Sequence, residues 1–290
     1  MSIDHAYRAK KSDKVVRHDF ESVGDFVRYA SETKAAADVS VASREPCSTN
    51  GFFGTFTFSQ AVELASAGWP EGAARVVELR EGCEAFLAAA KAAKTRGYGW
   101  DVTGDFIDVG RLLSGEPECC GLEQDGRGLG SRVVSIRLNA CVSASVSTDA
   151  ITARGLTVLV AADLLESCGI RCEILVSQAT YNDSRLVETN VCVKAPGVPI
   201  DIDRLAFAIA HPSFFRRFGF AFCEANGHSP IRCRVASLSD YEKREGTVEV
   251  DGVCSGDGLS DSELRANVLA IAKGCGLEFS DEELAEITQS

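Results

Sequence analysis

The sequence predicts an α/β protein with a mostly parallel sheet, helices on both faces and a mainly helical region before it. From residue 131 onward, short apolar segments alternate with longer segments of helical periodicity, which is typical of a sheet covered by helices. Before that residue, segments with strong helix propensity predominate, such as "AFLAAAKAAK". We expect a polar segment over 1–50 with one short helix, a helical region over 51–130 and an α/β domain over 131–290.

The composition excludes several classes of protein. Hydrophobic residues make up 45% of the 290 residues, as in ordinary globular proteins, and the formal net charge of −12 argues against binding nucleic acid through its phosphates. The longest apolar stretch, over 156–165, is too short to span a bilayer, and the N-terminus lacks the apolar core of a signal peptide. The twelve cysteines are therefore expected to be free thiols in a reducing cytoplasm.

Three helices are expected before the α/β domain. The first covers 19–32, where five apolar residues fall on one face. Ser59 is expected to cap the second helix, which ends at Gly68, and a proline begins a longer third helix over 70–94. The segment "GLEQDGRGLGS" has no periodicity and marks a domain boundary near residue 130.

The α/β domain is expected to contain five strands and three long helices. The strands cover 132–140, 170–178, 185–195, 232–238 and 246–252, and the helices cover 148–168, 199–211 and 261–273. The turn-like "TYNDS" between the second and third strands predicts a hairpin, and a last helical turn or two is expected over 281–287.

A serine-rich turn joins the first strand of this domain to its long helix. In "NACVSASVST", Ser143, Ser145 and Ser147 follow the strand directly. Such hydroxyls can hold a hard metal ion or an anion at the helix N-terminus. Alternatively, Ser147 or Thr148 caps the helix and the other hydroxyls bond to exposed amides. Both interpretations remain open at this point.

The order strand, serine turn, long helix, strand, antiparallel strand, helix, strand, helix resembles a von Willebrand factor A-type domain over about 131–279. In that family, the first strand ends in Asp-x-Ser-x-Ser, which is matched here by Cys141-Val-Ser143-Ala-Ser145. "VEVDG" resembles the late strand of the family, which ends in Asp-Gly.

The resemblance implies a Mg²⁺ site formed by Ser143, Ser145 and Asp251, with Thr180 as the nearest candidate for the family's threonine. Cys141 stands where the family has its first aspartate, and a thiol is a soft ligand that poorly replaces a carboxylate around Mg²⁺. We therefore expect a degenerate metal site.

The whole chain also resembles an uncharacterised family of tailed phages and prophages. The segments that carry this second resemblance are "FGTFTFSQAVELASAGWPEG", "DVGRLLSGEPEC", "RGLTVLVAADLLESCG" and "HPSFFRRFGFAFCE". Together the two resemblances imply a non-enzymatic adaptor in the host cytoplasm that binds a partner protein, such as an AAA+ ATPase. The expected binding surface comprises Asn139, Cys141, Ser147, Thr180, Arg216 and Arg217.

An acidic cluster supports an alternative function. "GDFIDVGRLLSGEPE" contains Asp105, Asp108, Glu116 and Glu118, and paired carboxylates can transfer protons or bind a metal ion. The alternative is a metal-dependent hydrolase of phosphodiesters, although acids around glycine turns are often only solvated. A virion component is the third hypothesis.

Overall fold

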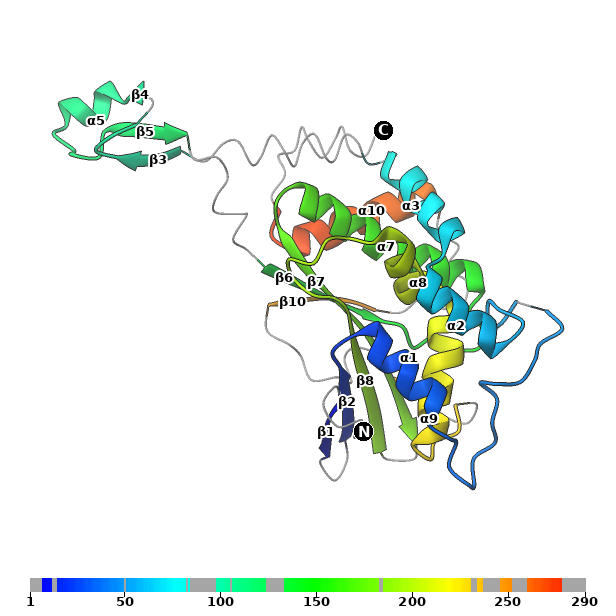
Figure 1. Cartoon of the computed structure of the whole chain (residues 1–290). Coiled ribbons are helices and arrows are strands. Elements are labelled where there is room, and N and C mark those ends of the chain that lie inside the picture. Colours follow the sequence, from blue (N-terminus) through cyan, green and yellow to red (C-terminus); the bar gives the residue numbers. More distant parts are fainter. Residues whose placement is uncertain are drawn as a thin grey trace.

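The computed structural model describes most of the chain as a main body and a small unit over 98–123 (Figure 1). The described residues are 7–11, 15–49, 51–81, 83, 98–104, 106–123, 133–182, 185–230, 234–236, 246–251 and 260–277. In the main body a seven-stranded sheet has the order β1-β2-β8-β7-β6-β10, with β9 paired to β7. The predicted α/β class is confirmed.

The main sheet is mixed. Its strands are β1 (Tyr7–Lys11), β2 (Val15–Phe20), β6 (Val133–Asn139), β7 (Arg171–Asn182), β8 (Arg185–Lys194), β9 (Arg234–Val235) and β10 (Thr247–Val250). The neighbours β10, β6 and β7 are parallel, whereas β8 runs antiparallel to β7, which confirms the predicted hairpin. Beyond β8, β2 is parallel to β8 and β1 is antiparallel to β2.

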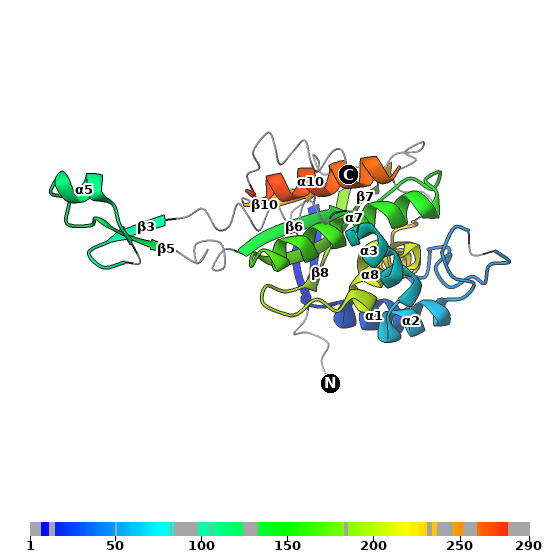
Figure 2. The same ribbon diagram turned by 90° about the horizontal axis from the view of Figure 1, so that it is seen from above.

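The described helices of the main body cover one face of this sheet, not two (Figures 1 and 2). They are α1 (Val23–Glu32), α2 (Phe58–Ala67), α3 (Pro70–Glu81), α7 (Thr148–Ser167), α8 (Ile202–Ala210), the π-helix η1 (Phe214–Gly219), α9 (Phe220–Ala225) and α10 (Asp261–Gly274). The core beneath them takes Ile136 from β6, Ile174 from β7 and Val250 from β10. For the described residues, the prediction of helices on both faces is therefore wrong.

The opposite face of the sheet carries a buried ion-pair network beside a small apolar cluster of Ala179, Leu186 and Ala236. Arg137 of β6 is fully buried there and pairs with Glu188 of β8 and Glu249 of β10. Glu188 also accepts a hydrogen bond from Arg17 of β2 at 2.8 Å. Because Arg137 alternates with the core residues Ile136 and Leu138, this strand has one apolar side and one polar side.

The N-terminal segment belongs to the same sheet. The one short helix expected over 1–50 is α1, and the sequence did not predict the strands before it: β2 pairs with β8 along six residues and Phe20 joins the main core. The first helix begins at Val23, not at residue 19, since Ser22 caps it by accepting a hydrogen bond from the backbone N–H of Asp25 at 3.1 Å.

Of the described residues over 51–130, the first part forms two helices and the last part forms the small unit. Thr57, not Ser59, caps α2 and forms a capping box with Gln60, and α2 ends at Gly68 with a φ of 92°, as predicted. The helix predicted over 70–94 is described as far as Glu81, and the turns predicted over 281–287 lie outside the described residues. The small unit is a three-stranded antiparallel sheet with one short helix. Its elements are β3 (Tyr98–Asp101), β4 (Phe106–Ile107), α5 (Val109–Leu113) and β5 (Cys120–Glu123).

Candidate functional site

The loop over 140–147 leaves the carboxyl end of β6, where parallel sheets commonly bind their ligands. Its base is apolar, because Val142 and Val146 are buried against Phe215 of η1. Its tip is exposed, and the hydroxyl oxygens of Ser143 and Ser145 lie 3.0 Å apart, within hydrogen-bonding distance of each other. The loop therefore presents a small polar tip on an apolar base.

A buried arginine holds this loop in place. The guanidinium of Arg216 donates hydrogen bonds to the carbonyl oxygens of Val146 at 2.7 Å and Ser143 at 3.4 Å. It also donates to the carbonyl oxygen of Phe52 at 2.8 Å and lies 4.2 Å from the centre of the Phe52 ring. Burial lowers the pKa of Arg216 to about 10, so the side chain stays charged at neutral pH. Arg216 thus fixes the loop to the rest of the body.

Arg217 holds a second segment of the chain in the same way. It is fully buried over the ring of Phe53, with 3.9 Å between the guanidinium carbon and the ring centre. It donates hydrogen bonds to the carbonyl oxygens of Ser43, Glu45, Thr55 and Phe56. The prediction that Arg216 and Arg217 belong to a binding surface is wrong, because both guanidinium groups bind backbone carbonyls inside the protein.

Asp251 follows β10 and meets β6 at the predicted edge of the sheet. The Asn139 side chain donates to the Asp251 carboxylate at 2.9 Å and to the Ala236 carbonyl oxygen at 3.2 Å, and it accepts a hydrogen bond from the Cys141 backbone N–H at 3.0 Å. Arg154 of α7 donates to the Asp251 carbonyl oxygen at 3.1 Å. Asn139, Cys141 and Asp251 therefore come together, as an amide-centred network.

The remaining predicted residues of the turn take separate places. Ser147 caps α7 by accepting a hydrogen bond from the Ala150 backbone N–H at 3.2 Å, which confirms the capping interpretation for this residue. Cys141 is buried in an apolar cluster, and Thr180 is buried in β7 opposite Val235. Within the part of the chain that the structure describes, no three side chains of His, Cys, Asp or Glu are grouped so that they could hold a metal ion.

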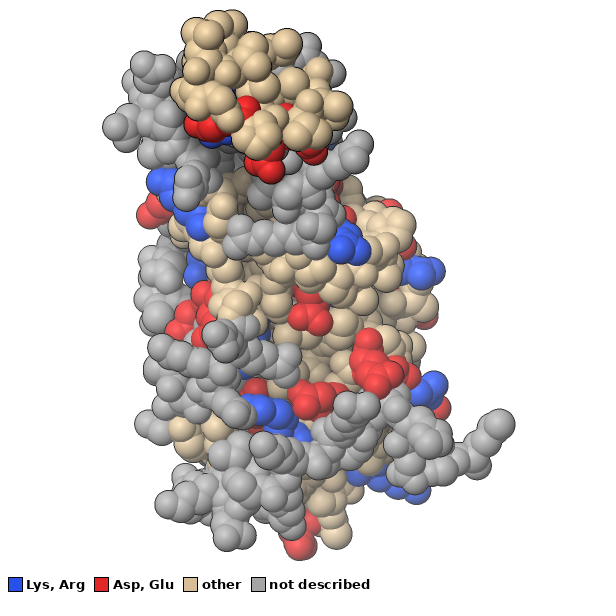
Figure 3. All heavy atoms as spheres, turned by 90° about the vertical axis from the view of Figure 1, so that its left-hand side faces the viewer, with Lys and Arg blue, Asp and Glu red and all other residues tan. Residues whose placement is uncertain are grey.

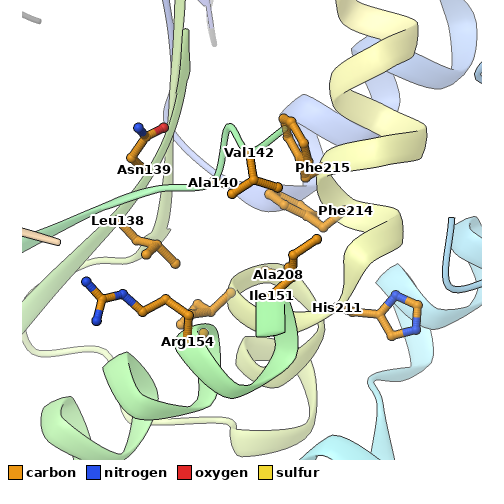
Figure 4. Close-up of a pocket in the computed structure, with 12 residues that line it drawn as sticks. Leu138, Asn139, Ala140, Val142, Ile151, Arg154, Ala208, His211, Phe214 and Phe215 are labelled. Atoms are coloured by element: carbon orange, nitrogen blue, oxygen red, sulfur yellow. The ribbon is translucent and has the colours of Figure 1, made fainter. Parts of the chain in front are cut away.

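A pocket that the sequence did not predict lies beside the loop (Figure 4). Its empty space is about 360 Å³, including the part open to solvent. Four elements and the loop contribute its lining, which consists of Leu138, Asn139, Ala140, Val142, Ile151, Arg154, Gly155, Ala208, Ile209, His211, Phe214 and Phe215. The walls are mainly apolar, Arg154 lies on the side towards β6, and the Asn139 side chain points away from the pocket on the other side of that strand (Figure 4).

His211 at the far side of this pocket is a packed, neutral side chain. Its ring stacks on Phe207 with 5.2 Å between ring centres and meets Trp69 edge-on at 4.7 Å. The Nδ1 atom accepts a hydrogen bond from the Ser213 backbone N–H at 3.1 Å, and burial lowers the pKa of His211 to about 4. These contacts make His211 a structural residue at neutral pH.

The acidic cluster of the small unit also has structural contacts. Asp108 caps α5 by accepting a hydrogen bond from the Arg111 backbone N–H at 3.0 Å. Arg111 then pairs with the Glu116 carboxylate at 3.1 Å and donates to the Glu118 carbonyl oxygen at 3.2 Å. Asp105 lies outside the described residues. The described contacts are a helix cap and an exposed ion pair.

Comparison with family models places this architecture in a family. The model of a domain of unknown function, DUF7192, matches residues 4–240. The chain belongs to the DUF7192 family. The matched range of this DUF7192 protein crosses the predicted boundaries near residues 50 and 130. It includes the loop over 140–147 and the pocket, whereas Asp251 and α10 lie beyond it.

No curated protein and no solved structure matches the chain. None of the described helices combines the length and the apolar character needed to cross a bilayer.

Proposed function

We propose that this DUF7192 protein is a non-enzymatic adaptor that binds a partner protein through the loop over 140–147 and the adjoining pocket. The observation that carries the proposal is the exposed tip of this loop, which the buried Arg216 holds beside a mainly apolar pocket. A loop that is already fixed loses little conformational freedom when it binds, which favours affinity.

The chemistry of the pocket supports a protein as the ligand. Mainly apolar walls accept an apolar side chain, and Arg154 lies at the edge of the pocket. Ser143 and Ser145 at the loop tip then offer hydroxyl groups that can donate and accept hydrogen bonds with the backbone of a docked segment. Buried His211 and buried Cys141 favour binding over catalysis, because both side chains pack inside the protein.

The resemblance to von Willebrand factor A-type domains extends the proposal to an AAA+ ATPase as the partner and, with the phage resemblance, to the cytoplasm of an infected host. The connectivity β6-α7-β7-β8-α8-β10-α10 supports it, since this order and the antiparallel β8 follow the expected pattern. Asp251 also lies beside β6, at the edge where the resemblance puts it, although its carboxylate binds Asn139.

The proposal is tested by placing a bulky side chain on the loop tip. In the full chain, Ala144→Trp should weaken co-purification of the partner from infected cells at least tenfold. Val198→Trp is the matched control, because Val198 is also exposed but lies in the turn after β8, at the opposite end of the sheet. A photo-crosslinking residue at position 144 should capture the same protein repeatedly, and one at position 198 should not.

Two results would contradict the proposal. Equal co-purification by the two tryptophan variants would show that the loop does not touch the partner. Hydrolysis of a phosphodiester substrate by the pure chain with Mg²⁺, lost in Asp251→Asn, would support the hydrolase hypothesis instead.

A further inference from the structure

The small unit exposes a concentration of apolar side chains. Five of the eleven exposed large apolar residues of the described chain lie within twelve positions of this unit. They are Val102, Ile107, Val109, Leu112 and Leu113, which we call the apolar patch. Scattered apolar residues on a surface are ordinary, whereas a contiguous group commonly marks an interaction site.

The helix of the small unit directs this patch outward. Val109, Leu112 and Leu113 are spaced i, i+3 and i+4 along α5, so they share one side of the helix. None of the residues of α5 is buried, and the Leu113 side chain is 83% exposed. A helical stripe with this spacing normally packs against another element. Here it remains open on the surface of the unit.

The small unit is also rich in acidic residues. Residues 98–123 contain six acidic residues and one arginine, a formal net charge of −5. Asp101, Glu116 and Glu118 are exposed, and the arginine, Arg111, pairs with Glu116. Figure 3 shows acidic side chains along the lower edge of the small unit, next to a broad area without charge. The small unit thus exposes both the apolar patch and a group of acidic side chains.

We infer that the apolar patch binds a basic amphipathic segment of a partner protein, in which apolar side chains are flanked by lysine or arginine. Apolar contact would provide the burial, and the acidic side chains would attract the flanking cations and select against acidic partners. A second copy of this chain is a poor occupant. Two small units, each of net charge −5, would then meet, and each belongs to a chain of net charge −12, so the two copies would repel each other. The inference does not depend on the loop over 140–147.

The test uses the full chain and a fluorescent helical peptide made of leucine and lysine in an amphipathic pattern. The peptide should bind, and Leu112→Ser with Leu113→Ser should weaken binding at least tenfold. Val77→Ser is the matched control, since Val77 of α3 is 49% exposed and Leu112 is 51% exposed. This control variant should bind like the unchanged protein. Circular dichroism of each variant shows whether the fold is retained.

A charge variant separates the two parts of the inference. Glu118→Lys leaves the apolar side chains in place, so it should weaken binding of the leucine–lysine peptide and strengthen binding of a leucine–glutamate peptide. Undiminished binding by the double serine variant would overturn the inference, as would equal affinity of the unchanged protein for both peptides. Self-association of the unchanged protein that the double variant abolishes would also overturn it, because the occupant would then be a second copy.

Discussion

At the carboxyl end of β6, the exposed tip of the loop over 140–147 rests on buried Val142, Val146 and Arg216. In the small unit, by contrast, three of the five residues of the apolar patch lie on α5, a five-residue helix without a buried residue. The loop depends on a residue at least 70 positions away in the sequence, and the patch depends on its immediate neighbours. Changes in the core should therefore disturb the loop and leave the patch unaffected.

Of the changes considered, a fall in pH should lower the free energy of unfolding of the main body most. Burial lowers the pKa values of His18 and His211 to about 4, from 6.5 in the unfolded chain. Since the unfolded chain binds these protons more readily, the two neutral histidines stabilise the fold fully above pH 6.5, and this contribution is lost as the pH falls towards 4. Each should cost about 3 kcal/mol of unfolding free energy over that range.

Urea unfolding at several pH values measures this loss. His211→Gln should remove about half of the loss that the two histidines cause between pH 6.5 and 4. The small unit contains no histidine, so binding of the leucine–lysine peptide should change much less over the upper part of this range. A variant whose stability falls with pH as steeply as that of the unchanged protein would refute the assignment to His211.

The second largest loss of unfolding free energy should come from removing the Arg216 side chain. Arg216→Met leaves the carbonyl oxygens of Phe52 and Val146 without their donor, which should lower the free energy of unfolding by about 3 kcal/mol. The matched change in the small unit is Arg111→Met, which breaks an exposed ion pair with Glu116 and should cost less than about 1 kcal/mol. Similar losses in urea unfolding would contradict the difference between the two regions.

A glycine beside the pocket should have an intermediate effect. A Cβ atom at Gly155 of α7 would lie 2.4 Å from the Ala210 Cα atom, so Gly155→Ala should force α7 and α8 apart and cost about 2 kcal/mol. Gly24 of α1 has no such neighbour, since its nearest atom, the Ser22 hydroxyl oxygen, would be 3.7 Å away. Gly24→Ala should stabilise the protein by up to about 1 kcal/mol, because alanine has the higher helix propensity. Thermal unfolding of both variants checks the opposite signs.

Local signals in the sequence predicted the middle of the fold well. The hairpin of β7 and β8, the cap at Ser147 and the end of α2 at Gly68 depend on residues close together in the chain. The polar side of β6 also left a signal, because apolar and polar residues alternate in this strand. That alternation is typical of a strand with one apolar and one polar side.

Contacts between distant residues could not be predicted from local patterns. The pairing of β2 with β8 joins Arg17 to Glu188 across 171 positions, and a short charged strand gives no sign of such a partner. Arg216 and Arg217 are charged and therefore fit a binding surface in the sequence, but both are buried in the structure. Phe214, Phe215 and Phe218, which flank the two arginines in the sequence, indicate that this segment is buried. The pocket is lined by residues from several elements that lie far apart in the sequence. Gly155, a glycine inside α7 that lies close to Ala210 of α8, is one of them.

The smallest expected change in stability comes from removing a helix N-cap, which can be done in both regions. Ser147 caps α7 and Asp108 caps α5, and each accepts a hydrogen bond from a backbone N–H three residues later. Ser147→Ala should lower the free energy of unfolding by about 1 kcal/mol, because α7 is part of the main core. Asp108→Ala should leave the main unfolding transition unchanged and weaken binding of the leucine–lysine peptide, because it loosens α5 and removes a negative charge beside the patch. If both alanine variants shift the main transition equally in urea, the small unit unfolds together with the body and the two regions are not independent.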